Sequence, residues 1–197
     1  MSKTGPTKQT GSTPVREALD RTAWIAGALG IVAQEGIGGL RVESLAKHLG
    51  VTKGSFYWHF KDRRDLIDAV LDDWRNSRIR DIRKQTSTEP GKERATLRHT
   101  IDIYAAARNR KGISIEATIR LWARQDAKGL AVVEEVDAER LACTRRLFLA
   151  LGLVPAEAAA RSALLYAYVF GFSMMQCGSF DMDIEQTKRW IAERITL

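Results

Sequence analysis

Apolar side chains recur at intervals of three and four residues along almost the whole chain, a spacing that places them on one face of an α-helix. Ile25, Ala28, Leu29 and Val32 form the first such set. No segment alternates apolar and polar residues as a half-buried strand does, and the sequence has no hairpin signal or internal repeat. The pattern therefore predicts an all-α protein.

Glycines and capping residues set the expected helix ends in the first part of the chain. We expect the first helix to end at Gly36, which can adopt the left-handed conformation, and a shorter second helix to end at Gly50. Thr52 is placed to cap a third short helix, and Asp62 to cap a fourth that runs to Ile82.

Five more helices are expected after a break at Pro90-Gly91. One of them, from Pro155 to about Gln176, is apolar nearly all round in its second half. A helix without a polar face has to be covered on more than one side, either by its own bundle or by a second copy of the chain. The others begin near Leu97 and near Ile115, span about 130–151 with Gly152 closing the helix, and span about 184–195.

Composition and charge narrow the classes of partner. Residues 1–64 hold ten basic and five acidic side chains, against 21 and 19 in the rest of the chain. Such an excess favours a polyanion, although a solvated basic face explains the charge equally well. The longest nearly apolar run, 163–172, is about half of a membrane span, so no membrane partner is expected.

The N-terminus and the cysteines indicate in which cellular compartment the protein is found. Residues 1–14 are expected to form a flexible arm, and their lysines are not followed by the apolar stretch of a secretory signal. Cys143 and Cys177 are too few for a disulfide framework and lie in apolar surroundings, so both are expected in a reduced core. We therefore expect a cytoplasmic protein.

One short segment carries the functional prediction. A helix, the tight Gly50-Val51 turn and a new helix opening at Thr52 form a helix-turn-helix arrangement, whose second helix can lie in the major groove of double-stranded DNA. Phe56 and Phe60 are four residues apart and are expected to point into a small core. The other face of this helix is then left for solvent or DNA.

The residue types on that outer face suit two kinds of DNA contact. Lys53 is the best candidate to read a base, with guanine N7 and O6 as its acceptors, and Gly54 lets the helix approach the groove closely. Short polar and basic side chains suit phosphate oxygens. The candidates for phosphate are Thr52, Ser55, Tyr57, His59 and Lys61, with Arg63 or Arg64 beyond them.

Several of these residues also have a purely structural interpretation. Thr52 can serve only as a cap, Tyr57 and Trp58 only in packing, and His59 as a histidine held between two helices. The combination is more specific than any single residue, and Trp58 is kept in the candidate DNA-binding set.

The run Gly-Val-Thr-Lys-Gly-Ser-Phe-Tyr-Trp-His-Phe at residues 50–60 is highly specific. With Ala28, Gly36 and Leu45-Ala46 before it, the chain from residue 23 to residue 71 resembles the TetR family of transcriptional regulators. The resemblance implies a DNA-binding domain at residues 15–62 and a larger helical domain at 63–197 that dimerises and often binds an effector. It maps Thr52, Lys53, Tyr57, His59 and Lys61 onto DNA-contacting positions.

Arg41 departs from the family's pattern, which commonly has Ser or Thr at the start of the first helix of the motif. The usual cap is therefore in question, but an arginine at this position can reach a phosphate. We include Arg41 among the candidate DNA contacts.

The C-terminal part predicts a homodimer. If the helices at 155–176 and 184–195 pack against their copies, the two-fold dimer reads a near-palindromic DNA site. We expect this dimer to be a repressor, which a small apolar or aromatic ligand releases from its operator. Some aromatic and soft side chains suit such a ligand, and they fit an ordinary core better still. These candidate effector contacts are Trp74, Tyr104, Trp122, Phe148, Tyr168, Phe172 and Met175.

An enzyme and an architectural DNA-binding protein are the two alternatives to a transcriptional regulator. The sequence has no phosphate-binding loop, nucleophile elbow or metalloprotease motif, and its three histidines lack a ligand-like spacing, so we expect no enzyme, no metal and no cofactor. An architectural DNA-binding protein of the same fold, without an effector, stays open as an alternative. It would bind many chromosomal sites.

Overall fold

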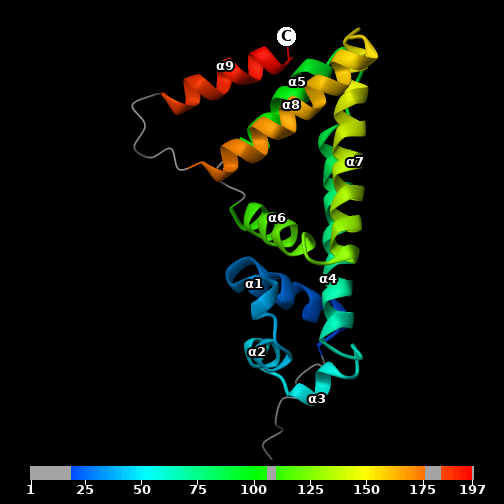
Figure 1. The fold of residues 1–197 in the computed structure, drawn as a ribbon, viewed down its shortest axis with the longest axis vertical. Helices are drawn as coiled ribbons and strands as arrows, with labels where there is room; N and C mark the ends of the chain where they lie inside the picture. The colour runs from blue at the N-terminus through cyan, green and yellow to red at the C-terminus, as the bar shows by residue number, and fades with distance from the viewer. Residues whose placement is uncertain (1–18, 106–109, 176–182, 197) are drawn as a thin grey trace, which may run out of the picture.

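The structure is a computed structural model that describes residues 19–105, 110–175 and 183–196. These residues form nine helices and no strand, which confirms the all-α prediction (Figure 1). The predicted N-terminal arm, Cys177 and the side chain of Tyr104 lie outside the described part. The helices are α1 Arg21–Gly39, α2 Val42–His48, α3 Lys53–Phe56, α4 Arg63–Gln85, α5 Glu93–Ala105, α6 Arg110–Ala123, α7 Ala127–Ala150, α8 Pro155–Met174 and α9 Ile184–Thr196.

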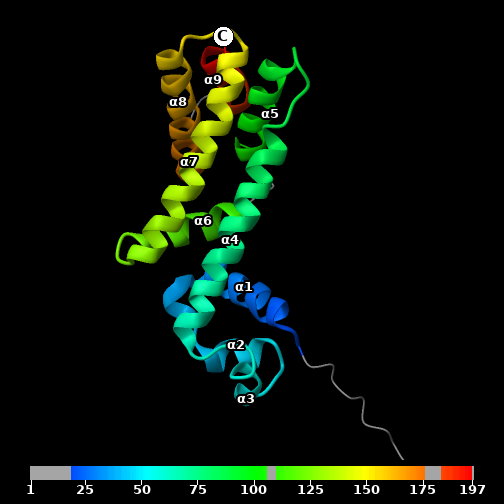
Figure 2. The same ribbon diagram turned by 90° about the vertical axis from the view of Figure 1, so that its right-hand side faces the viewer.

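Two long helices, α4 and α7, form the frame of the molecule and pack against each other along its long axis (Figures 1 and 2). The first three helices gather at one end of α4, and α5, α8 and α9 lie at the other end. Between these groups, α6 contacts both α1 and α7. A single helix, α4, therefore continues from the helix-turn-helix unit into the C-terminal bundle.

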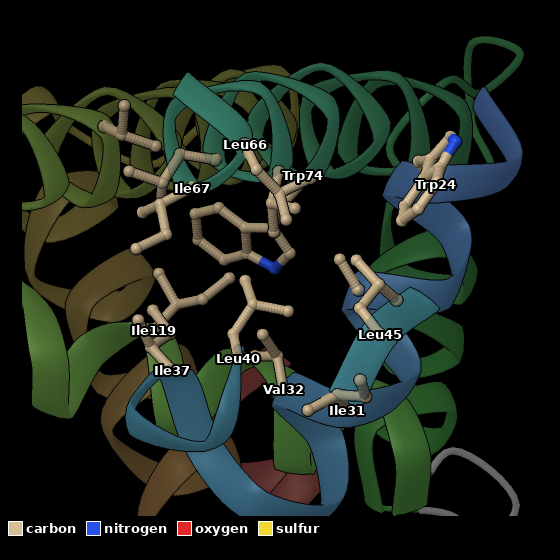
Figure 3. Packing of buried hydrophobic residues seen from close by; sticks show 14 of the residues in the cluster. Trp24, Ile31, Val32, Ile37, Leu40, Leu45, Leu66, Ile67, Trp74 and Ile119 are labelled. Atoms are coloured by element: carbon tan, nitrogen blue, oxygen red, sulfur yellow. The ribbon is translucent and has the colours of Figure 1, made fainter. Parts of the chain in front are cut away.

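The larger apolar cluster extends from the helix-turn-helix unit to α6 and α7. Cys143 of α7 is one of its members and is buried, as predicted. A second cluster joins α5, α7, α8 and α9, with Phe148 and Leu165 fully buried in it. The predicted division of the chain at residue 62 stays a prediction. Figure 3 labels ten members of the larger cluster: Trp24, Ile31, Val32, Ile37, Leu40, Leu45, Leu66, Ile67, Trp74 and Ile119.

The helix ends follow the local signals closely. Gly50 and Gly152 have φ angles of 68° and 88°, the left-handed conformation that glycine adopts at low cost. Asp62 accepts a hydrogen bond from the backbone N–H of Asp65 at 2.9 Å and so caps α4. Pro155 occupies the first turn of α8, where its missing donor is not needed.

Gly36 interrupts α1 but does not end it. Its φ of 76° breaks the regular helix, as predicted, yet one further turn follows as far as Gly39. The guanidinium group of Arg63 lies against this turn. It donates to the carbonyl oxygens of Ile37 at 2.7 Å and Leu40 at 2.5 Å.

One side of α8 is covered by its own bundle and the other is not. Leu165 and Val169 are buried in the second cluster, while Leu164 and Met174 are 54% and 75% exposed. None of the helices in the described ranges has both the length and the apolar character that crossing a bilayer requires.

Candidate nucleic-acid interface

A tight turn sets α3 against α2. The α2 helix ends at His48, and the N–H of Val51 returns to the carbonyl oxygen of Ala46 at 3.0 Å across the Gly50 turn. Thr52 then caps α3, because its hydroxyl oxygen accepts from the N–H of Ser55 at 3.4 Å. The predicted helix-turn-helix arrangement is confirmed.

Aromatic packing fixes the inner face of this unit. Phe56 and Phe60 are buried as predicted, with their ring centroids 5.3 Å apart. The ring of Trp24, on α1, meets Phe56 edge to face at 5.5 Å. On the other side, Arg21 lies over the ring of Phe60 and donates to the carbonyl oxygen of His59 at 2.5 Å. Both α1 and these aromatic side chains therefore hold the orientation of α3.

The α3 helix is shorter than expected. It ends at Phe56, and the chain continues to Phe60 through a turn in which the N–H groups of His59 and Phe60 both donate to the carbonyl oxygen of Phe56, at 2.9 and 3.0 Å. Both Phe56 and Phe60 are still buried in the small core, although only Phe56 lies in the helix.

The predicted DNA-binding residues belong to the N-cap of α2, to α3 with its N-cap, and to the segment between α3 and α4. Two of them, Ser55 and His59, are partly buried, and the others are exposed. Trp58 is 88% exposed and Tyr57 55%, so packing does not account for Trp58. We call this set the outer face, and its members are Arg41, Thr52, Lys53, Gly54, Ser55, Tyr57, Trp58, His59 and Lys61.

Glu43, which the sequence did not single out, is the direct partner of Lys53. Lys53 Nζ donates to Glu43 Oε1 at 2.5 Å across the turn between α3 and α2. This hydrogen bond raises the pKa of Lys53 and lowers that of Glu43. The ammonium group predicted to read a base is therefore held by a carboxylate in the DNA-free protein.

Arg41 stands at the N-cap of α2 with an extended backbone, and its side chain makes no capping hydrogen bond. The usual side-chain cap, which the arginine put in question, is absent at this helix. The side chain of Arg41 is exposed.

Arg63 or Arg64 is a further candidate for phosphate, and both have intramolecular partners in the structure. Arg63 binds the two backbone carbonyls at the end of α1. Arg64 pairs with Asp68 at 2.9 Å and with Asp126, the cap of α7. The Asp68 pair is an ordinary contact between residues four apart on one helix, whereas the carbonyl groups of α1 and Asp126 are distant in the sequence, so no local pattern predicts those contacts.

The aromatic residues suggested for an effector do not form one site. Trp74 and Phe148 are buried core residues, and Trp122 lies against the Arg64 guanidinium. Tyr168 and Phe172, with Met175, line a cavity of about 370 Å³ between α8 and α9.

Residues 25–70 match the model of the family described as bacterial regulatory proteins, tetR family. The tetracycline repressor protein class C of Escherichia coli is 43% identical over 54 residues, which make up 27% of this chain and 25% of that repressor. This chain carries a TetR-family DNA-binding domain. The match spans about a quarter of the length of that curated relative.

Solved structures with a similar fold cover almost the whole chain. A transcriptional regulator from Rhodococcus sp. Rha1 covers 90% of this chain and 92% of its own, with a TM-score of 0.69 and 16% identity. The multidrug binding protein EbrR, solved in complex with malachite green, covers 92% and 98%, with a TM-score of 0.63 and 21% identity. At such identities the likeness shows the fold alone, which these structures share with almost the whole chain.

Proposed function

We infer that the protein is a TetR-family transcriptional repressor that binds a palindromic operator as a homodimer and is released from it by a small ligand. The observation that carries this proposal is the outer face of α3, which remains exposed while Phe56 and Phe60 fix the helix from the inner side. A rigidly mounted helix with an exposed polar face is what reading a major groove requires.

In this proposal Lys53 exchanges Glu43 for guanine N7 and O6 when DNA binds. Gly54 allows the close approach, and the exposed Trp58 lies flat against the sugar-phosphate backbone beside the groove. Phosphate oxygens accept from the remaining members of the outer face. These are Arg41, Thr52, Ser55, Tyr57, His59 and Lys61.

The exposed face of α8 is the proposed dimer contact. Leu164, Ala167, Gly171 and Met174 follow one another at helical spacing and are all exposed in the isolated chain. Burying an apolar stripe of this kind against its own copy gives a two-fold dimer with paired α3 helices. Such a dimer reads two half-sites of a near-palindrome.

The dimer is tested with a charge placed on that face. Leu164→Glu is expected to convert a dimer into a monomer in sedimentation velocity, because two carboxylates would be buried at the two-fold contact. Ala131→Glu, at an exposed position of α7, is the matched control and is expected to leave the dimer intact. A wild-type monomer, or a dimer that survives Leu164→Glu, refutes this contact.

The connection between ligand and DNA is proposed to run through α4 and α6. Arg63, in the first turn of α4, binds the end of α1. Ser114 of α6 donates to the carbonyl oxygen of Ala33 at 2.7 Å, also on α1. A ligand that changes the position of α4 or α6 in the bundle therefore acts on the helix against which α3 is packed.

DNA binding is tested by selecting operator sequences from a random duplex pool and measuring their affinity by fluorescence anisotropy across a salt series. Lys53→Ala is expected to cost about 1–3 kcal/mol at the selected site, and Tyr57→Ala to weaken binding as well. Lys84→Ala, an exposed lysine near the far end of α4, is the matched control and should bind like the wild type.

Equal, weak binding to every duplex by the wild-type dimer would refute the proposed operator recognition. Chromatin profiling then separates the two TetR-like alternatives. A local repressor occupies a few sites, whereas an architectural protein without an effector occupies many.

A further inference from the structure

Residues of α4, α6 and α8 line a small apolar cavity. Figure 1 shows how α6 passes the end of α8. The volume of the cavity is about 210 Å³, and Ile113, Val169 and Phe170 supply much of its apolar lining. Cavities for drug-sized ligands are commonly about 300–1,000 Å³, so this one suits a smaller molecule. Three charged side chains, Arg78, Glu116 and Arg120, also line it.

The carboxylate of Glu116 is already fully used. Its Oε1 accepts from Arg120 Nε and Nη2 at 3.0 and 2.9 Å, and its Oε2 accepts from Arg140 Nη2 at 2.7 Å. Asp137 binds the same two arginines, at 2.5 Å and 3.0 Å at its Oδ1. Two carboxylates therefore balance two guanidinium groups, and this cluster gives a cationic ligand no unpaired carboxylate.

Arg78 differs from these arginines. Its side chain is only 11% exposed, and its Nη2 donates at 3.0 Å to Asp81, whose own side chain is 52% exposed. Its Nε is buried and has no hydrogen-bond partner among the described residues. A buried donor without an acceptor is unfavourable, and a guanidinium group forms strong, charge-assisted hydrogen bonds with a carboxylate.

Arg78 stands at the boundary of the apolar cavity. Together with Gly112 it also lines an open, polar groove of about 900 Å³, to which Lys84 and His99 contribute. Glu89 in that groove pairs with Lys92 at 2.6 Å. A ligand with one apolar and one polar end can therefore place its apolar end inside and its polar end at Arg78.

We propose that this cavity binds a small amphipathic carboxylic acid, whose apolar part lies among α4, α6 and α8 and whose carboxylate accepts from Arg78. The inference rests on the proposed function, because it names the chemical class of the releasing ligand. It also moves the ligand away from the aromatic residues that the sequence suggested, since none of them lines this cavity.

The test is isothermal titration calorimetry on the full chain. The probes are straight-chain carboxylates from butanoate to decanoate and the aromatic acids phenylacetate and 3-phenylpropanoate. Each acid is compared with the primary alcohol and the primary amine of the same skeleton. At least one acid is expected to bind about tenfold or more tightly than its alcohol. If no acid does so, or if an amine binds more tightly than its acid, the proposal is overturned.

Variants assign the binding to this cavity. Arg78→Gln is expected to lower the affinity for the most tightly bound acid by about 10–100-fold, because it removes charge-assisted hydrogen bonds. Arg80→Gln changes an exposed arginine two residues further along α4, outside the lining of these cavities, and should leave the affinity unchanged. Ala117→Leu narrows the apolar part without touching Arg78 and should also weaken the acid. Equal affinities in Arg78→Gln and Arg80→Gln would refute the assignment.

Acid binding is measured without DNA, and operator binding is measured without acid. A chain that binds its operator but no acid refutes this inference alone. A chain that binds an acid through Arg78 but no operator refutes the proposed function and leaves the cavity assignment standing.

Discussion

Replacing Arg63 by glutamine separates a structural arginine from the phosphate contact proposed two residues earlier. The Nε and Nη2 groups of Arg63 donate to the carbonyl oxygens of Leu40 and Ile37 at 2.5 and 2.7 Å. A hydrogen bond from a charged donor contributes about 1.5–3 kcal/mol where it is buried, and solvent lowers this at a partly exposed site. We expect Arg63→Gln to reduce the free energy of unfolding by about 1–3 kcal/mol.

Lys61→Gln is the matched control. Lys61 is exposed, and the interaction that holds it is the hydrogen bond from its backbone N–H to Asp65 at 3.0 Å, which the substitution keeps. The free energy of unfolding of the Lys61→Gln variant should stay within about 0.5 kcal/mol of that of the wild type. Its operator affinity should depend less on salt, with the slope of log K against log salt smaller by about one for each subunit.

Two assays read these changes. For a chain of this size, about 1 kcal/mol shifts the Tm by about 2–4 °C, so circular dichroism should show Arg63→Gln melting about 2–12 °C lower. Anisotropy on the selected operator gives the salt slope, which Arg63→Gln should leave unchanged. The reasoning fails if Arg63→Gln keeps its Tm but loses salt dependence, or if Lys61→Gln melts as low as Arg63→Gln.

Three further predictions concern the interface and the bundle. Phe56→Ala removes a fully buried ring that contacts Trp24 and Phe60, and it should lower the free energy of unfolding by about 3–5 kcal/mol; an unchanged urea midpoint would contradict this. Glu43→Gln removes the carboxylate that holds Lys53, so anisotropy should show tighter operator binding, and equal or weaker binding would show that Lys53 does not move to the DNA. Burial alone would raise the pKa of Asp137, but the hydrogen bonds and charge of Arg120 outweigh it and hold this pKa below its ordinary value. Asp137 therefore stabilises the fold above about pH 4, and this stabilisation is lost as the pH falls through the lowered pKa. The Tm of Asp137→Asn should fall less steeply than that of the wild type between about pH 5 and pH 3. Parallel Tm profiles would show that Asp137 does not contribute.

Local signals predicted the helix ends because the groups that make a cap lie within a few residues of each other. Thr52 and Asp62 each cap a backbone N–H three residues ahead, and Gly50 needs only its own backbone freedom. The burial of Phe56 follows from helical spacing in the same way, whereas Phe60 is buried from the turn that follows α3. These features suffice to predict the helix-turn-helix unit and its exposed outer face.

The contacts that hold this unit were not predictable, since they join residues far apart in the chain. Arg63 looked like a phosphate ligand because its neighbours are basic, but it binds carbonyls at Ile37 and Leu40. The candidate effector residues stay a prediction. Aromatic side chains at helical spacing also build a core, as Trp74 and Phe148 do, while Tyr168 and Phe172 line a cavity. Arg78 is one of several arginines on α4 in the sequence, and only its burial distinguishes it.

The helix that links the two proposed sites also restricts how they can communicate. Arg63 binds α1 from the first turn of α4, and Arg78 lies fifteen residues further on, about 22 Å along the helix axis. A ligand at Arg78 can release DNA only if it binds the DNA-free arrangement more tightly than the DNA-bound one. By thermodynamic linkage, the factor by which operator DNA lowers the affinity for the best acid must equal the factor by which that acid lowers the affinity for operator DNA. Calorimetry of the acid with and without operator, compared with operator affinity with and without acid, checks this equality. An acid that binds the free and the operator-bound dimer equally would refute coupling through α4, even if its contact with Arg78 were confirmed.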